Sequence, residues 1–291
     1  MGVAWVFPGQ GSQSPGMGLD LATHPLGQRR YAEAAEVLGW SVVDICTPPA
    51  TDLNQTRHTQ PCLYVVAAIL ADLLRERGQA PDGVAGHSLG EYTALYVAGV
   101  FDFATGLDLV NQRAKLMEMC GEGRMVALVG FDRPAVEAAV AAIPDVVLAN
   151  DNHPDQVVVS GTSQAVETLL GQVKVKRAVP LAVSGAFHSP LVVPAAAAFA
   201  QVLERVPFRE AQVPVWSNVE PTPTQSAEHL KARLGQQMTT GVRWRETVLA
   251  LAAAGLDTVV EVGPGKVLTG LVKRTAPDLK LVNIGQLADL P

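Results

Sequence analysis

The chain has 291 residues, a length that fits about two folding units or one domain that carries an insertion. Hydrophobic residues make up 48% of it and charged residues 17%, which excludes disorder and coiled coil as descriptions of the whole chain. The formal net charge of -6 argues against broad nucleic-acid binding, although it leaves room for a local basic patch that recruits an acidic partner.

Cysteine usage and hydrophobic stretches indicate a cytoplasmic protein. Cys46, Cys62 and Cys120 are too few and too far apart for a disulfide framework or a four-ligand zinc site, and they fit a reducing compartment. The apolar residues 1–7 have no basic segment before them and predict no secretory signal. Residues 63–74 are apolar but fall short of the roughly 20 residues that span a bilayer. We therefore expect neither a metal nor a membrane partner.

The first third of the chain predicts a parallel α/β sheet. The apolar run at 3–7 is typical of a buried strand that ends in a tight turn. A helix is expected over 61–77, with Pro61 at its start. A short strand at 83–86 then leads into a helix at about 89–98. Strands that alternate with helices indicate parallel pairing.

A second pattern begins near residue 124 and has the order βαββαβ. Its expected elements are a strand at 125–130, a helix at 134–142, strands at 146–149 and 156–160, a helix at 163–173 and a strand at 177–183. This order is the ferredoxin-like arrangement. After residue 190 the pattern returns to long helices, a strand at 257–262 and a final helix. We therefore expect a large α/β subdomain formed by 1–123 and 190–291, with a ferredoxin-like small subdomain at 124–189 inserted into it.

The segment Gly86-His87-Ser88-Leu89-Gly90 has the form G-x-S-x-G between a predicted strand and a predicted helix, the context of a nucleophile elbow. Two glycines allow a sharp turn that lifts the Ser88 hydroxyl out of the sheet at a helix N-terminus. An oxyanion formed there would be stabilised by the Leu89 N–H and by a donor from another loop. The alternative is a capping box, with Ser88 as N-cap and Glu91 as its partner.

The glycine-rich segment 7–13, at the carboxyl end of the first strand, lies where open α/β sheets bind ligands and is a source for that second N–H. It lacks the Lys-Ser/Thr ending of a P-loop, so nucleotide binding is disfavoured, and a plain tight turn is the alternative. His188 is the best candidate base, because its loop leaves the inserted unit and faces a cleft between the two units; an exposed loop histidine is the alternative. His87 is expected to have a structural role. The remaining histidines lie in polar stretches and are expected to be solvated: His24, His58, His153 and His229.

Arg113 falls on a predicted helix whose apolar face includes Leu109, Leu116 and Met117, so its guanidinium needs a carboxylate. That partner is either a protein Asp or Glu or a substrate carboxylate. The segment 261–266 suggests phosphate binding by its Gly-Pro-Gly-Lys ending, but a structural turn after a strand explains it better.

At this point the chain resembles the malonyl-CoA:acyl carrier protein transacylases of type II fatty acid synthesis and the related acyltransferase domains of polyketide synthases. The matching motifs span almost the whole chain: FPGQGSQ at 7–13, QP at 60–61, GHSLGEYTAL at 86–95, QRAKLM at 112–117, AFHSPL at 186–191 and EVGPGKVLTGL at 261–271. The resemblance implies a hydrolase-like α/β core with a ferredoxin-like insertion.

The resemblance also implies roles for particular residues. Ser88 would be the nucleophile, His188 the base and Arg113 the clamp for the free carboxylate of a malonyl group. The backbone N–H groups of Gln10 and Leu89 would form the oxyanion hole. A backbone carbonyl, here that of Gln237 with Gln236 as the alternative register, would orient the histidine. Phe187, just before His188, would crowd an α-methyl branch on the acyl group.

The implied activity is ping-pong transfer of a malonyl group from malonyl-CoA to the phosphopantetheine thiol of acyl carrier protein through a malonyl-serine intermediate. Coenzyme A would enter only as part of the substrate, and no cofactor is implied. One rival is a serine hydrolase whose acid is Asp151 or Asp155; the other is a non-catalytic module that holds carrier protein. Because carrier proteins are acidic, a positive patch is expected near the cleft, with these candidates: Lys174, Lys176, Arg177, Lys266, Lys273 and Arg274.

Overall fold

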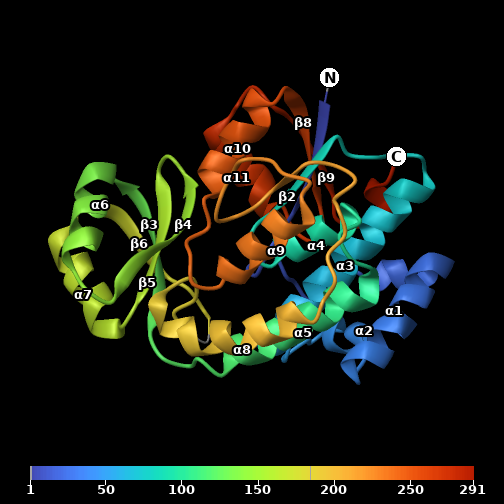
Figure 1. Ribbon diagram of the computed structural model, residues 1–291, viewed down its shortest axis with the longest axis horizontal. Helices are drawn as coiled ribbons and strands as arrows, with labels where there is room; N and C mark the ends of the chain where they lie inside the picture. The colour runs from blue at the N-terminus through green and yellow to red at the C-terminus, as the bar shows by residue number, and fades with distance from the viewer. Residues whose placement is uncertain (1, 184) are drawn as a thin grey trace.

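The computed structural model describes residues 2–183 and 185–291, whose strands form two separate sheets (Figure 1). Sheet A is five-stranded and parallel throughout, in the order β7-β2-β1-β8-β9. Its strands are β1 (Gly2–Phe7), β2 (Gly83–Gly86), β7 (Val215–Trp216), β8 (Leu256–Val262) and β9 (Lys280–Ile284). The prediction of a parallel α/β sheet is therefore confirmed.

The central strand β1 is apolar along its whole length because both faces of sheet A are covered. Trp5 and Phe7 belong to the core on one face, and Ala4 and Val6 to the core on the other. The helices α3 (Thr56–Glu76), α4 (Gly90–Val97) and α5 (Phe103–Glu118) lie on the first face, and α10 (Trp244–Ala253) and α11 (Val267–Thr275) on the second. Because helices cover both faces of sheet A, the loops that follow β1 and β2 meet at the carboxyl ends of these strands.

Further helices surround this core. They are α1 (Pro25–Leu38), α2 (Val42–Cys46), α8 (Val193–Glu204) and α9 (Ala227–Gln236), with short 3₁₀ helices at η1 (Leu19–Thr23), η2 (Pro190–Val192) and η3 (Leu287–Asp289). In Figure 1, α8 and α5 run along the lower side of the molecule, while α10 and α11 lie above α9.

Sheet B is four-stranded and antiparallel, in the order β4-β5-β3-β6. Its elements are β3 (Arg124–Phe131), α6 (Arg133–Ala142), β4 (Val146–His153), β5 (Gln156–Gly161), α7 (Ser163–Gln172) and β6 (Val175–Pro180). Chain order and strand order together are those of a ferredoxin-like unit, as predicted. Val126 and Leu128 pack under α6 and α7, which lie on the outer side of the sheet in Figure 1. Met125 and Ala127 alternate with them and join the core of the main body.

Three elements differ from the prediction by more than one residue, and one of them is β4, which ends at His153 instead of residue 149. Helix α3 begins at Thr56, five residues before Pro61, which therefore lies inside the helix. The missing N–H of Pro61 costs one hydrogen bond of the first helical turns, and the burial of nearly all of the helix outweighs that cost. Strand β6 covers 175–180 instead of 177–183, because residues 175–180 pair with β3. The subdomain boundaries at 123/124 and 189/190 stay a prediction.

Candidate active site

Ser88 lies in the sharp turn between β2 and α4, with a left-handed φ of 51°. Both flanking glycines are required by close packing. A Cβ on Gly86 would lie 1.9 Å from the Gly90 carbonyl carbon, and one on Gly90 would lie 2.0 Å from the Phe7 carbonyl oxygen. Left-handed backbone at a residue other than glycine is a strained conformation that surrounding structure must hold. The turn therefore has the form of a nucleophile elbow.

The capping-box alternative is wrong. The N-cap of α4 is Leu89, and no side chain caps this end of the helix. The Glu91 carboxylate points away from Ser88 N and accepts hydrogen bonds from Gln237 Nε2 at 2.8 Å and from Asn218 N at 3.2 Å. Instead, Asn218 Oδ1 accepts from the Ser88 N–H at 2.6 Å.

His188 faces the Ser88 hydroxyl from the loop that follows sheet B. Its Nε2 lies 2.8 Å from Ser88 Oγ, and its Nδ1 lies 2.9 Å from the Gln237 carbonyl oxygen and 3.1 Å from that of Thr240. Two carbonyl acceptors at Nδ1 require a proton there, so Nε2 is the nitrogen that accepts from Ser88. His188 is only 4% exposed, which excludes the alternative of a solvated loop histidine.

The imidazole of His188 is neutral at physiological pH. Burial, and after it the positive charge of Arg113, lowers the pKa of His188 to about 3. A neutral imidazole in contact with a serine hydroxyl can accept its proton.

No described carboxylate hydrogen-bonds to His188. Asp151 instead forms salt bridges of 2.9 Å with both Arg133 and Arg245. Asp155 is exposed, and its backbone N–H donates a hydrogen bond to His153 Nδ1. Neither residue therefore occupies the acid position that a hydrolase triad requires. Of the two candidate glutamines, it is Gln237, not Gln236, whose backbone carbonyl accepts the hydrogen bond from His188 Nδ1.

The loop after β1 and the elbow both line a cavity that contains Ser88. Gln10 and Leu89 both line this cavity beside Ser88, and no described residue accepts a hydrogen bond from either backbone N–H. Two unpaired N–H groups next to a serine hydroxyl are what an oxyanion hole needs.

Arg113, on α5, is fully buried and reaches the same cavity. Its Nη1 donates to Gln60 Oε1 at 2.7 Å, and its Nη2 donates to Gln237 Oε1 at 3.0 Å and to Ser88 Oγ at 3.1 Å. None of these acceptors is a carboxylate, and no salt bridge to Arg113 is formed within the described residues. Burial lowers the pKa of Arg113, although a guanidinium keeps its charge. The alternative of a salt bridge to a protein carboxylate is thus wrong.

Several residues of this network were not singled out in the sequence. Gln60 belonged to a matching motif but had no predicted role. Glu91 was considered only as a helix cap, and no role was predicted for Asn218. Asn218 joins both ends of the elbow, because its Nδ2 also donates to Gly86 O at 2.6 Å. Its partners Gly86 and Ser88 lie more than 100 residues away in the chain, which left no local signal.

The other histidines differ in their surroundings. His87 Nε2 lies 2.9 Å from Asn152 Oδ1, and its ring meets Trp244 edge-on, contacts that fit the structural role expected for it. His153 is only 2% exposed, and the prediction that it is solvated is wrong. It ends β4, which packs against α10 and α11, and this contact buries it.

Ser88 lines one cavity, and a second cavity adjoins the first without containing Ser88. The inner one is lined by the catalytic candidates together with Phe187 and Met117, and Phe187 is 4% exposed. The second shares Gln10, His87, Asn150 and Leu181 with the first and extends between sheet B and the Val267, Leu268 and Leu271 side of α11. The second cavity thus lies on the α11 side of the cavity that Ser88 lines.

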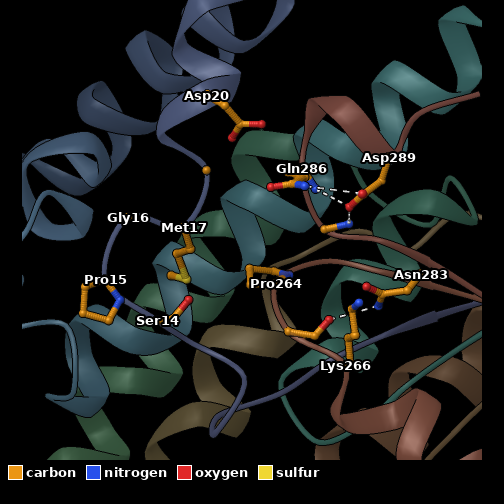
Figure 2. A pocket seen from close by; sticks show the side chains of 13 residues that line it. Ser14, Pro15, Gly16, Met17, Asp20, Pro264, Lys266, Asn283, Gln286 and Asp289 are labelled. Atoms are coloured by element: carbon orange, nitrogen blue, oxygen red, sulfur yellow. Dashed lines mark hydrogen bonds between the residues drawn. The ribbon is translucent and has the colours of Figure 1, made fainter.

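A further pocket, shown in Figure 2, lies at the Gly-Pro-Gly-Lys turn and does not contain Ser88. Its polar groups largely satisfy one another: Asp289 accepts from Gln286, and Asn283 donates to the Gly265 carbonyl. Lys266 is the single cation among its lining residues, which also include the acids Asp20 and Asp289. Phosphate binding is therefore disfavoured here, and the buried Glu261 caps the first turn of α11 through Leu268 N and Thr269 N.

Among the residues described, no helix is long and apolar enough to cross a membrane, and no group of His, Cys, Asp and Glu is arranged to hold a metal ion.

A serine on a strained elbow in contact with a neutral histidine is typical of enzymes that form acyl-serine intermediates. The chain matches the acyl transferase domain family over residues 4–287. The chain therefore belongs to the acyl transferase domain family.

Its relatives are similar along their full length. A malonyl CoA-acyl carrier protein transacylase of Synechocystis sp. is 58% identical over 290 residues, which cover 100% of this chain and 99% of the relative. The protein of that name from Escherichia coli K12 is 41% identical over 288 residues, 95% of this chain and 93% of the relative.

The solved structures that this chain resembles are of transacylases as well. The crystal structure of the Synechocystis sp. PCC 6803 malonyl-CoA:ACP transacylase superposes with a TM-score of 0.98 at 57% identity and covers 99% of both chains. The malonyl-transacylase chain in a complex with a type II polyketide synthase acyl carrier protein has a TM-score of 0.94 at 40% identity and covers 99% of this chain and 97% of its own. The predicted family and fold class are thus confirmed.

Proposed function

We propose that this chain is a malonyl-CoA:acyl carrier protein transacylase that works through a malonyl-serine intermediate. The observation that carries the proposal is the contact of Ser88 Oγ with both His188 Nε2 at 2.8 Å and Arg113 Nη2 at 3.1 Å. These contacts support the roles of base for His188 and of carboxylate-binding cation for Arg113 beside the nucleophile Ser88. The names of the full-length relatives support the same substrate and acceptor.

In the first half-reaction, Ser88 Oγ attacks the thioester carbonyl of malonyl-CoA while His188 Nε2 takes its proton. The N–H groups of Gln10 and Leu89 stabilise the tetrahedral oxyanion. The C–S bond then breaks, and the proton on His188 passes to the thiolate of coenzyme A. The Gln237 and Thr240 carbonyls hold Nδ1–H throughout, so the imidazole keeps the required orientation.

Arg113 selects the acyl group in this proposal. A guanidinium that lacks a protein carboxylate gains an ion pair when the malonyl carboxylate binds, whereas an acetyl group leaves it buried and unpaired. The substrate charge has a second effect. Because the Arg113 charge depresses the pKa of His188, a bound carboxylate offsets that charge and strengthens the base. Phe187, at the cavity wall, crowds an α-methyl branch.

In the second half-reaction, the phosphopantetheine thiol of acyl carrier protein gives its proton to His188 and attacks the carbonyl of the malonyl-serine ester. The ester C–Oγ bond then breaks, and the proton on His188 passes to Ser88 Oγ. The cavity beside α11 offers the path for the pantetheine arm. Lys266, Lys273 and Arg274 are exposed at the start and end of this helix, so an acidic carrier protein docks there. Lys174, Lys176 and Arg177 lie instead at and beside the outer strand β6.

No step of this mechanism needs a metal or an organic cofactor, and coenzyme A takes part only as the thioester carrier. We place the reaction in the cytoplasm, where reduced cysteines such as Cys46, Cys62 and Cys120 are the rule. Relatives whose names specify polyketide biosynthesis and relatives whose names specify no pathway both match the chain, so the proposal covers the carrier proteins of fatty acid and of polyketide synthesis.

Intact-protein mass spectrometry after brief incubation with malonyl-CoA tests the proposal, with Ser88→Ala as the matched control. We expect a malonyl-sized adduct on the wild-type chain and none on the variant. An adduct that persists on Ser88→Ala contradicts the assigned nucleophile. No adduct with any thioester favours a carrier-protein binding module without chemistry.

A further inference from the structure

The side chain of Gln237 forms contacts that its backbone carbonyl does not need. Its Nε2 donates to Ser88 O at 2.8 Å and to Glu91 Oε2 at 2.8 Å, while its Oε1 accepts from Arg113 Nη2 at 3.0 Å. With the amide reversed, the oxygen would face two acceptors and the NH₂ group would face a guanidinium. The surroundings therefore permit a single amide orientation.

Glu91 is the acceptor that enforces this orientation, and burial raises the pKa of its carboxyl group. It lies in the first turn of α4, is 1% exposed, and its Oε2 also accepts from Asn218 N at 3.2 Å. No hydrogen bond or salt bridge joins Glu91 to Arg113 within the described residues, because the Gln237 amide bonds to both. The acid and the guanidinium are thus linked through a neutral group.

This separation matters for the charge of Arg113. All three of its hydrogen-bond acceptors are neutral, and its buried Nε has no hydrogen-bond partner among the described residues. A direct ion pair with Glu91 would neutralise the guanidinium before a substrate arrived and would compete with the substrate carboxylate. An amide oxygen instead holds the group in place and leaves its charge available.

We propose that Glu91 and the side chain of Gln237 are positioning residues for acyl-group selection, which hold Arg113 at the cavity with its charge unpaired. The inference rests on the proposed function, in which Arg113 binds the acyl carboxylate. It gives Gln237 two separable roles: the backbone carbonyl serves His188, and the side chain serves Arg113. Selectivity and base function are therefore expected to respond to different changes at one residue.

Gln237→Met separates the two roles, because it keeps the backbone carbonyl and the side-chain length but removes the amide. Glu91→Leu removes the acceptor that orients the Gln237 amide. Glu91→Gln is its matched control, since the new side chain has an oxygen that can accept the same hydrogen bond. For each variant the rate of Ser88 acylation is measured by intact mass with malonyl-CoA and, over longer times, with acetyl-CoA. Thermal melting is recorded in parallel.

We expect Gln237→Met and Glu91→Leu to lower the malonyl rate about tenfold or more, the loss typical of a hydrogen bond to a charged group, with the acetyl rate changed less than about threefold. Glu91→Gln is expected to stay within about threefold of wild type for both substrates. Equal losses for the two thioesters in Gln237→Met, or an unchanged malonyl rate, would overturn the inference. A wild-type chain that forms no malonyl adduct would instead overturn the proposed function, so the two failures are distinguishable. If Glu91→Leu does not fold, Gln237→Met decides alone.

Discussion

The Nδ1 atom of His188 lies 2.9 Å from the backbone carbonyl oxygen of Gln237, in the place where a serine hydrolase has a carboxylate. A carbonyl fixes the tautomer and the ring orientation, as an acid would. It carries no charge, so it adds little to the basicity of the ring. The low pKa of His188 fits this arrangement, since burial and Arg113 oppose protonation and no carboxylate favours it.

Removal of the base His188 should slow acylation sharply, whereas removal of the carboxylate of Asp151 should not. His188→Ala is expected to lower the malonyl acylation rate by about 10² to 10⁴, the usual contribution of a general base. Asp151→Asn should stay within about twofold in rate, because Asp151 pairs with Arg133 and Arg245 and not with His188. Stopped-flow or quenched acylation assays measure both. A loss of 100-fold or more in Asp151→Asn would restore the hydrolase triad.

The protonation of His188 gives a pH test. Its pKa in the folded protein is about 3, below its ordinary value of 6.5, so the unfolded chain binds a proton first as the pH falls. The contribution of this group to the free energy of unfolding is therefore full above about pH 6.5 and is lost progressively towards pH 3. Histidine-ring NMR should show no titration of His188 between about pH 5 and pH 8. A midpoint near the ordinary value would contradict the buried, neutral imidazole.

Arg113→Lys should separate malonyl from acetyl transfer. A lysine ammonium cannot reproduce the planar fork that meets Gln60, Gln237 and a carboxylate at once. We expect kcat/KM for malonyl-CoA to fall by about 10² or more, while acetyl-CoA changes little. Steady-state kinetics with both thioesters measure the split. Wild-type malonyl kinetics in this variant would remove the clamp role.

Charge reversal on α11 tests the docking surface. Lys273→Glu combined with Arg274→Glu is expected to raise KM for carrier protein about fivefold or more at low salt, with the malonyl acylation rate unchanged. Lys174→Glu combined with Lys176→Glu is the matched control, because these lysines lie at and beside β6 and not on the helix that lines the cavity. Equal effects of the two pairs would indicate nonspecific attraction. No effect of the α11 pair would exclude Lys273 and Arg274.

Local patterns in the sequence predicted much of this molecule. The G-x-S-x-G turn could be located because both glycines are adjacent to the serine they accommodate, and the βαββαβ order could be read from periodicity alone. The start of α3 was predicted wrongly at Pro61, because tertiary burial of the helix outweighs the one hydrogen bond that this proline loses. The polar neighbours of His153 likewise hid its contact with other elements. These outcomes depend on packing that no local window contains.

The hydrogen-bond network behind the elbow was beyond such patterns for the same reason. Asn218 meets Ser88 across 130 residues, and Gln237 meets Glu91 across 146. Glu91 looked like a helix cap because its spacing from Ser88 suits one, yet the folded chain turns its carboxylate towards distant amides. The motifs supplied the reacting groups, and the resemblance supplied the Gln237 carbonyl that orients His188. The contacts of the Gln237, Glu91 and Asn218 side chains came from the structure.

The most direct test of the central claim is the fate of the isolated malonyl-serine form of the protein. The desalted adduct is divided between buffer and holo acyl carrier protein, and intact mass is followed on both proteins. We expect the adduct to persist in buffer and to clear within seconds to minutes as the carrier protein gains one malonyl group. Clearance at the same rate in buffer alone, with no gain of mass on the carrier protein, would contradict transfer and identify a hydrolase.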